Sequence, residues 1–473
     1  IEMNSTNTSG SIYAYLMYYG YNSHAHNNTI KTNKAGGYTR AYVVYAGDKD
    51  SATNNTIEIL GNTYTYNYLA YSCVAHYVVD NDVYIETNNR TIYGTYIGYD
   101  NGIFANNKIV HQSNTGTVTG LYMDYANGSR IYNNLIVTKT DGTNYGARAY
   151  YVYPSTSFFN NTVYTTGTGS SNYNIYVYNS SSSYGIKMYN NIFYKTGSSG
   201  YNAYVRSADQ VFSDHNLYYK PSGDIFDGVK TEANLHDWRK GTGLDRNSIF
   251  YDVEFTDAAN HDFSIIASSE NAWAVNARAM HDTARKTDYA SQAVPQFTED
   301  GVPDIGAFEV MPTSTPPLAI ASPAAPVANS TQTFTFGQDT VLTMECGATV
   351  PVSYDVRQYA GTKATPVPAG LERMFFYTEG TPATFSHSYK ANTYYKDSWL
   401  GNIPIEEDAV MARKSDAGGW VGYNYNNAFR DVENNVLSTA GTIDSVGSYT
   451  AVRNGRIGIR CVYPTTGIRF SNI

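Results

Sequence analysis

The chain repeats a pattern in which a polar pair precedes a short strand of alternating apolar and polar positions. Eight asparagines mark the second residue of each pair: Asn28, Asn55, Asn81, Asn107, Asn134, Asn161, Asn191 and Asn216. Two residues after each of them stands an apolar residue: Ile30, Ile57, Val83, Ile109, Ile136, Val163, Phe193 and Tyr218. The residue between is polar in five repeats. Because neighbouring residues of a strand face opposite sides, the pattern predicts one buried face and one largely exposed face.

The repeat has a nearly constant period. Successive asparagines of the set are 25 to 30 residues apart, and each interval also holds a tyrosine-rich run and a corner of Gly, Ser and Asn. Such a period is typical of a stacked architecture. Three short strands fill one interval, which predicts a right-handed parallel β-helix whose rungs are about 4.8 Å apart.

The asparagines have a physical reason to recur at one corner. Asn is depleted in strands and favoured in turns, so a single pair indicates a turn. When the same corner is stacked on every rung, each side-chain amide can hydrogen-bond to the amides above and below it. We therefore predict an asparagine ladder that is made of the eight residues and has a structural role.

The repeat fades after about residue 225, and the chain then changes character. Residues 311–329 are rich in Pro, Ala and Ser, which predicts a linker. Residues 330–473 carry short strand-like runs between turn signals, without the asparagine pair, and this predicts an antiparallel β-sandwich of Ig-like or jelly-roll-like form. The expected fold class is all-β, with the β-helix over residues 1–310.

Two stretches resemble known families. The segments "SDHNLYYKPSGD" (213–224), "DWRKGTGLDRNSIFYDVEFTDAANHDFSI" (237–265) and "VPDIGAFEV" (302–310) resemble the closing rungs of bacterial secreted right-handed parallel β-helix repeat proteins. The chain departs from that pattern at Val253, where the family usually has Pro, and at residues 268–277. The run that begins "VSYDVRQYAG" (352–361) resembles Ig-like domains of Bacteroidota surface proteins. These resemblances imply a secreted or cell-surface protein.

Composition and charge exclude several classes. The 473 residues include 47 Tyr, only 15% are charged, and the net charge is -9. A disordered chain has few aromatic residues and more charge, and a nucleic-acid-binding protein has basic clusters, so neither class fits. No run of about 18 apolar residues predicts a membrane span. The chain opens at Ile1 within what resembles a repeat, so we expect a piece of a longer protein.

The acidic residues predict no catalytic centre. β-Helices of this kind host polysaccharide lyases and glycoside hydrolases, which need aligned carboxylates or Ca²⁺ beside a basic residue. Asp124 lies 10 residues before Asn134 and Arg148 lies 13 before Asn161, so they belong to different columns. We expect no catalytic residue, no metal and no cofactor. One alternative is Ca²⁺ at Glu299, Asp300 and Asp304, which the turn that ends the β-helix explains equally well.

Cysteine and tyrosine supply the remaining candidates. Cys346 and Cys461 lie near the two ends of the C-terminal region and are candidates for one disulfide. Tyr15, Tyr42 and Tyr68 each precede the asparagine of their rung by 13 residues, so they should stack. If they face inward they fill the core. If they face outward they form an aromatic strip that binds sugar rings or a protein.

These observations favour a noncatalytic extracellular or cell-surface adhesin or structural protein. Its tyrosine-rich β-helix would bind an extracellular glycan or a surface protein. One alternative is a polysaccharide lyase or glycoside hydrolase. A second alternative is the subunit of a homopolymeric surface filament, which would require self-association.

Overall fold

The computed structural model shows two compact units. It describes residues 1–70, 73–179, 181–296, 301–365, 367, 372–381, 386–414, 420–422, 428–439, 443–445 and 447–453. The first unit comprises Ile1–Gln296, Val302–Thr315 and Gly337–Asp339, and the second comprises Phe297–Gly301, Pro316–Phe336 and Thr340–Ile473.

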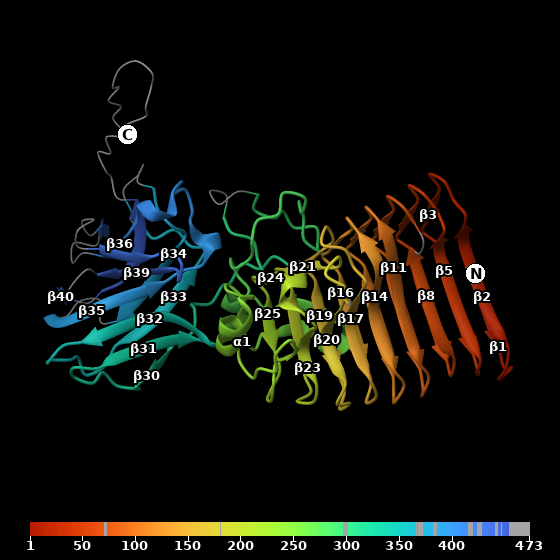
Figure 1. Cartoon of the computed structure of the whole chain (residues 1–473), viewed down its shortest axis with the longest axis horizontal. Helices are drawn as coiled ribbons and strands as arrows, with labels where there is room; N and C mark the ends of the chain where they lie inside the picture. Colours follow the sequence, from red (N-terminus) through yellow and green to blue (C-terminus); the bar gives the residue numbers. More distant parts are fainter. Residues whose placement is uncertain are drawn as a thin grey trace, which may run out of the picture. The chain divides into compact units, whose positions relative to one another are not determined.

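The first unit is a parallel β-helix of about eight turns, built from three parallel sheets (Figure 1). The nine-stranded sheet holds the tyrosine-rich runs: β2 (Ser11–Tyr18), β5 (Tyr38–Tyr45), β8 (Tyr64–Ala70), β11 (Ile92–Asp100), β14 (Val118–Asn127), β17 (Asn144–Tyr150), β20 (Asn172–Tyr178), β23 (Tyr201–Val205) and β26 (Phe226–Gly228). The eight-stranded sheet leads to the asparagine pairs: β3 (His24–His26), β6 (Ser51–Thr53), β9 (Tyr77–Val79), β12 (Ile103–Ala105), β15 (Arg130–Tyr132), β18 (Ser157–Phe159), β21 (Ile186–Tyr189) and β24 (Val211–Asp214).

The ten-stranded sheet follows the asparagine pairs. Its strands are β1 (Glu2–Ser5), β4 (Thr29–Lys34), β7 (Thr56–Gly61), β10 (Asp82–Thr87), β13 (Lys108–Ser113), β16 (Leu135–Lys139), β19 (Thr162–Thr166), β22 (Ile192–Lys195), β25 (Leu217–Tyr219) and β27 (Ile249–Phe250). Equivalent residues of successive repeats pair directly, as in Ile109, Ile136 and Val163. The register of the sheet therefore follows the period of the sequence.

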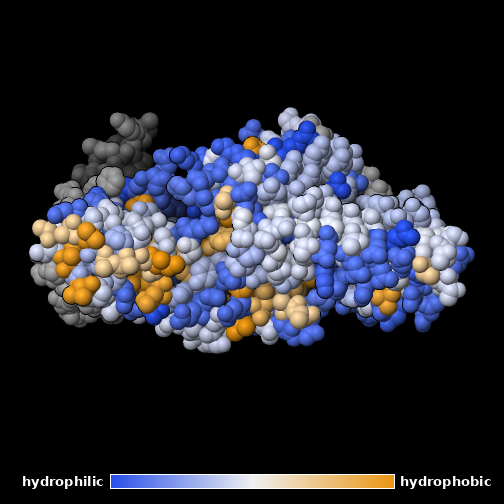
Figure 2. Space-filling model, turned by 90° about the horizontal axis from the view of Figure 1, so that it is seen from below, coloured by the Kyte–Doolittle hydropathy of each residue, from blue (hydrophilic) through white to orange (hydrophobic). Residues whose placement is uncertain are grey.

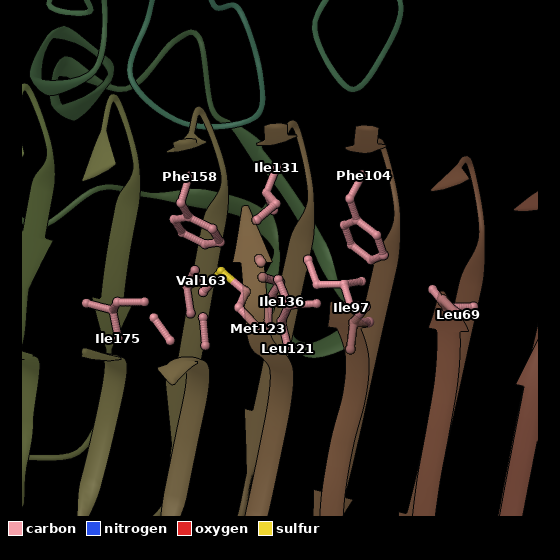
Figure 3. Packing of buried hydrophobic residues seen from close by; sticks show 14 of the residues in the cluster. Leu69, Ile97, Phe104, Leu121, Met123, Ile131, Ile136, Phe158, Val163 and Ile175 are labelled. Carbon is pink, nitrogen blue, oxygen red and sulfur yellow. The ribbon is translucent and has the colours of Figure 1, made fainter. Parts of the chain in front are cut away.

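The core runs along the inside of the β-helix. The predicted apolar column from Ile30 to Tyr218 is buried at all eight positions. Side chains from the other two sheets pack against it, and Figure 3 shows Phe104, Ile131 and Phe158 above Ile136 and Val163. The prediction of a parallel β-helix with this column in its core is confirmed.

The intervening column differs from its prediction on the later rungs. Thr29, Thr56 and Asp82 are exposed, but Leu135 and Thr162 are buried. The cause is a closing segment, residues 255–296 and 302–308, whose Phe263 and Ala307 pack on Leu135 and on neighbouring apolar residues of the ten-stranded sheet. This closing segment contains the short hairpin of β28 (Phe255–Asp257) and β29 (Asp262–Ile265) and the 3₁₀ turns η2 (Ala258–Asn260) and η3 (Glu270–Ala274).

A short helix, α1 (Leu235–Thr242), caps the last rung. Trp238 stacks on Phe226 at 4.4 Å between ring centroids, and its indole donates to the buried carboxyl of Asp245. Ser213 and Ser248 also donate to that carboxyl. The remaining 3₁₀ turn of this unit is η1 (Ala208–Gln210). These contacts cover the end of the apolar core with a hydrogen-bonded layer.

The second unit is a β-sandwich of two antiparallel sheets, which confirms the predicted fold class. One sheet contains β30 (Ile320–Ser322), β31 (Thr331–Phe336), β32 (Asp339–Cys346), β35 (Ser386–Tyr394), β38 (Ala428–Asp431), β39 (Val436–Thr439) and β40 (Ile443–Ser445). The other contains β33 (Asp355–Ala360), β34 (Phe376–Thr381), β36 (Ala409–Lys414), β37 (Trp420–Gly422) and β41 (Tyr449–Arg453). Two 3₁₀ turns, η4 (Asp397–Trp399) and η5 (Glu406–Asp408), join them.

Two details of this unit bear on the sequence predictions. Strand β30 lies within residues 311–329, which were predicted to be a linker, and pairs with β31. Cys346 is buried at the end of β32. Its proposed disulfide partner, Cys461, lies outside the described residues, so the disulfide stays a prediction.

Candidate functional site

The two residues of each polar pair have different structural roles. The first residue takes the left-handed conformation on every rung: Asn27, Asn54, Asp80, Asn106, Asn133, Asn160, Asn190 and His215, with φ between 49° and 61° at these and the other Asn corners. Asn and Asp tolerate this region better than other non-glycine residues. The second residue points inward and makes the ladder. The sequence predicted the turn and the ladder, but not this division between the two residues of the pair.

The ladder runs without a break through the eight asparagines. In the central rungs, the Asn107 side chain donates to Asn134 Oδ1 at 3.0 Å, and the Asn134 side chain donates to Asn161 Oδ1 at 2.9 Å. The backbone N–H of Asn107 donates to the same Asn134 oxygen. At the last rung, the backbone N–H of Asn216 donates to Ser248 Oγ at 2.8 Å. These asparagines are committed to the fold, so a binding site has to be sought on other faces.

The outer face of the nine-stranded sheet carries the tyrosines. One register position holds Tyr15, Tyr42, Tyr68, Tyr96, Tyr122, Tyr176 and Tyr204, with Arg148 between Tyr122 and Tyr176; we call this set the tyrosine column. Its neighbours along each strand, such as Ala41 and Leu121, belong to the core cluster, so the column faces outward.

The rings of the tyrosine column stack on one another. The centroids of Tyr15 and Tyr42 are 4.4 Å apart and those of Tyr42 and Tyr68 are 4.6 Å apart, with interplanar angles of 5° in both pairs. Tyr176 and Tyr204 repeat this geometry at 4.4 Å. In these pairs each ring covers a face of the next, so the stacked part of the column presents ring edges to solvent. Face-on stacking of a sugar between these rings is therefore blocked.

Parallel columns of aromatic side chains flank the tyrosine column. Tyr145 stacks on Tyr173 at 5.7 Å on one side, and Tyr150 stacks on Tyr178 at 5.5 Å on the other. Burial raises the pKa of Tyr122 and of Tyr176 to about 12. The hydroxyls of both residues stay protonated at neutral pH and can donate as well as accept hydrogen bonds.

Arg148 replaces a tyrosine in the middle of this face. Its guanidinium carbon lies 5.2 Å from the ring centroid of Tyr122, 5.3 Å from those of Tyr145 and Tyr150, and 5.9 Å from that of Tyr176. Rings around a cation stabilise it through their quadrupoles. Arg148 is thus half-buried among four rings on the outer face of the sheet.

Asp124 is the acidic neighbour of Arg148. The register pairs Tyr122 with Arg148 and Asp124 with Tyr150, so the two charged residues are in different columns, as predicted. They are nevertheless diagonal neighbours on adjacent strands. Burial raises the pKa of Asp124 to about 6, and the positive charge of Arg148 opposes that shift. A comparison of column positions in the sequence could not show that Asp124 and Arg148 are diagonal neighbours.

The acidic residues that the sequence offered as a Ca²⁺ site are the next candidates. Asp304 is buried and accepts hydrogen bonds from the backbone of Ala277 and Val310. Glu299 and Asp300, its proposed companions in a Ca²⁺ site, lie outside the described residues. Among the side chains that the structure describes, no group of three or more His, Cys, Asp or Glu is placed to hold a metal ion.

A pocket of about 370 Å³ lies between the ten-stranded sheet and the closing segment. Tyr164, Tyr194, Phe255, Asp252 and Glu254 contribute to its wall. The Tyr194 hydroxyl already donates to Asp252 at 2.7 Å, and the aromatic rings pack edge to face on each other. Tyr194 and Asp252 thus satisfy each other's hydrogen bonds, unlike the Nε of Arg148.

Within the described part of the chain, no helix is long and apolar enough to span a bilayer. Figure 2 shows that the surface of the β-helix, at right, is mostly hydrophilic or neutral on the side it displays, with only small apolar spots. Neither a protein-family model nor a curated protein sequence matches the chain. The candidate site is therefore defined by geometry alone, as the tyrosine column with Arg148 and Asp124.

Proposed function

We propose that this is a noncatalytic extracellular or cell-surface protein that binds a linear glycan along the tyrosine column. The observation that carries the proposal is the stacking of tyrosines at one register position, which repeats a hydroxyl group and a ring edge on successive rungs. A polymer of sugars is itself a repeat of hydroxyl groups on an apolar ring. Hydrogen bonds to the hydroxyls and contacts with the ring edges match that chemistry.

The rigidity of the scaffold supports binding. The stacked rings are held by strands that pair residue by residue, so few side chains have to be ordered when a ligand binds. The conformational entropy that side chains lose on binding is a large part of the free energy that opposes association, and a preorganised surface reduces this loss. A rigid row of tyrosine hydroxyl groups would bind a polymer through many weak contacts.

Binding to a panel of neutral and acidic polysaccharides, measured by affinity electrophoresis and calorimetry, tests the proposal. The variant Tyr15→Phe/Tyr122→Phe/Tyr204→Phe removes three hydroxyls and keeps the stacked rings. We expect its affinity to fall by about tenfold or more, since each hydrogen bond contributes about 0.5–1.5 kcal/mol. Tyr77→Phe, an exposed tyrosine of the eight-stranded sheet, is the matched control. Unchanged binding by the triple variant, or no binding by the native chain, would refute the proposal.

One observation favours the second candidate, a polysaccharide lyase or glycoside hydrolase. A carboxyl with a pKa of about 6 beside an arginine, as in Asp124, is suited to general acid or base chemistry. Enzyme activity would appear as new reducing or unsaturated chain ends that the native protein releases and Asp124→Asn does not. That result would replace the noncatalytic function.

A further inference from the structure

Arg148 interrupts the tyrosine column at one rung. The positions above and below it, Tyr122 and Tyr176, keep the tyrosine, and the strand pairing is regular through all three. The residue is thus not at a bulge or at an end of the sheet. A tyrosine at this position would continue the stack, so the arginine is not needed to form the sheet.

Among the described residues, no carboxylate lies within ion-pair distance of the Arg148 guanidinium. None of the ion pairs between described residues includes Arg148. Its Nε is buried and makes no hydrogen bond. An arginine with a buried, unmet donor in a partly desolvated place is costly unless a ligand supplies an acceptor.

The surroundings would strengthen binding of an anion. The four rings around the guanidinium leave Arg148 only partly exposed to water, and electrostatic attraction is stronger where water is partly excluded. The planar fork of an arginine matches the two oxygens of a carboxylate or two oxygens of a sulfate. The flanking tyrosine hydroxyls can bond the neighbouring sugar hydroxyls at the same time.

Asp124 is the only acidic group that the structure places in electrostatic contact with Arg148 among the described residues. It lies on the adjacent strand and makes no ion pair with Arg148. Burial raises the pKa of Asp124 to about 6, so its carboxyl is still largely ionised at pH 7, and its repulsion of an incoming anion weakens only as the pH falls below about 6.

We propose that Arg148 is a subsite for an acidic sugar, which binds the carboxylate or sulfate group of a polysaccharide that lies along the tyrosine column. This inference rests on the proposed function, because it places the charged group of the same ligand. It predicts that the glycan is acidic: a hexuronan if the group is a carboxylate, or a sulfated polymer if it is a sulfate.

The test compares three polymers with related backbones: polygalacturonate, a sulfated galactan and a neutral galactan. The variant Arg148→Tyr restores the regular column and removes the charge, so it should fold. We expect native protein to prefer one acidic polymer, and Arg148→Tyr to lose about tenfold or more of that affinity while its binding to the neutral galactan is unchanged. Lys187→Gln, which removes an exposed charge from the eight-stranded sheet, should have no effect.

The outcomes separate the two proposals. Selective loss with polygalacturonate identifies a carboxylate, and selective loss with the sulfated galactan identifies a sulfate. Equal affinity of the native protein and Arg148→Tyr for all three polymers would overturn the acidic subsite and leave glycan binding intact. Absence of binding to any glycan would overturn both. A loss of similar size in Lys187→Gln would show a general charge effect and would also overturn the subsite.

Discussion

At the residue scale, the two asparagines of each corner meet different physical demands. The first must place its backbone in the left-handed region, and the second must satisfy its amide in the interior. An amide has two donors and an acceptor, and the ladder uses all of them: Asn134 accepts from Asn107 and donates to Asn161 and to the Phe104 carbonyl. This pairing explains how a polar residue occupies a buried column at low cost.

Asn134→Ala should therefore be strongly destabilising. The change removes the oxygen that accepts from the Asn107 backbone N–H and the side-chain amide that donates to the Phe104 carbonyl and to Asn161, and we expect a loss of at least about 2 kcal/mol in the free energy of unfolding. Urea unfolding followed by circular dichroism measures it. Asn28→Ala is the matched control at the first rung. Asn28 is partly exposed and donates to Asn55, so the loss should be under about 1 kcal/mol. Equal losses in the two variants would contradict the ladder.

At the element scale, each rung depends on a corner that turns the chain between two sheets. Asn54 lies at such a corner with a φ of 52°, and its side chain is exposed. The strands on either side, β6 and β7, pair with the equivalent strands of the next rung. A corner that cannot adopt this conformation would disturb the register of both.

Asn54→Val and Asn54→Gly separate backbone conformation from side-chain contacts. A β-branched residue is strained in the left-handed region, so the valine variant should lose about 1–2 kcal/mol of stability. Glycine adopts this region freely, so its variant should stay within about 1 kcal/mol of the native chain. Thermal unfolding of the two variants gives the comparison. If the glycine variant loses as much stability as the valine variant, the loss comes from the Asn54 side chain and not from the backbone conformation of the corner.

At the scale of the whole β-helix unit, the closing segment covers the later rungs of the ten-stranded sheet. Arg285 fixes it there: its Nε donates to Asn133 Oδ1 at 2.7 Å, and its guanidinium pairs with Glu309 at 2.5 Å. Asn160 donates to the carbonyl groups of Asp304 and Gly306. Asn133 and Asn160, each the first residue of its pair, thus form a corner of the β-helix and also hydrogen-bond to the closing segment.

Arg285→Met should loosen this segment. Arg285 is almost fully buried, and burial already raises the pKa of Glu309. Removing the arginine leaves Glu309 without its counter-charge, and we expect a loss of about 3–5 kcal/mol. Urea unfolding and limited proteolysis of residues 255–310 measure it. Glu309→Gln in the same chain should recover part of the loss, and Lys286→Met, an exposed neighbour, should change little. Unaltered stability in Arg285→Met would show that apolar packing alone holds the segment.

The period of the sequence was sufficient to predict the rungs, the ladder and the buried column. These features depend on residues that recur at the same offset, such as Asn134 and Ile136, and parallel pairing aligns equal offsets. The burial of Leu135 was not predictable in this way. It depends on Phe263 and Ala307, which lie more than a hundred residues later and belong to no repeat.

The sequence by itself determined the local architecture, because a regular period and the alternation of apolar and polar positions dictate a stacked, parallel β fold. Only the tertiary structure decided which side chains meet between columns. It stacked the tyrosines so that their edges face solvent, and it brought Asp124 beside Arg148 across two strands. These contacts depend on side-chain directions and on diagonal neighbours, and spacing along the chain records neither.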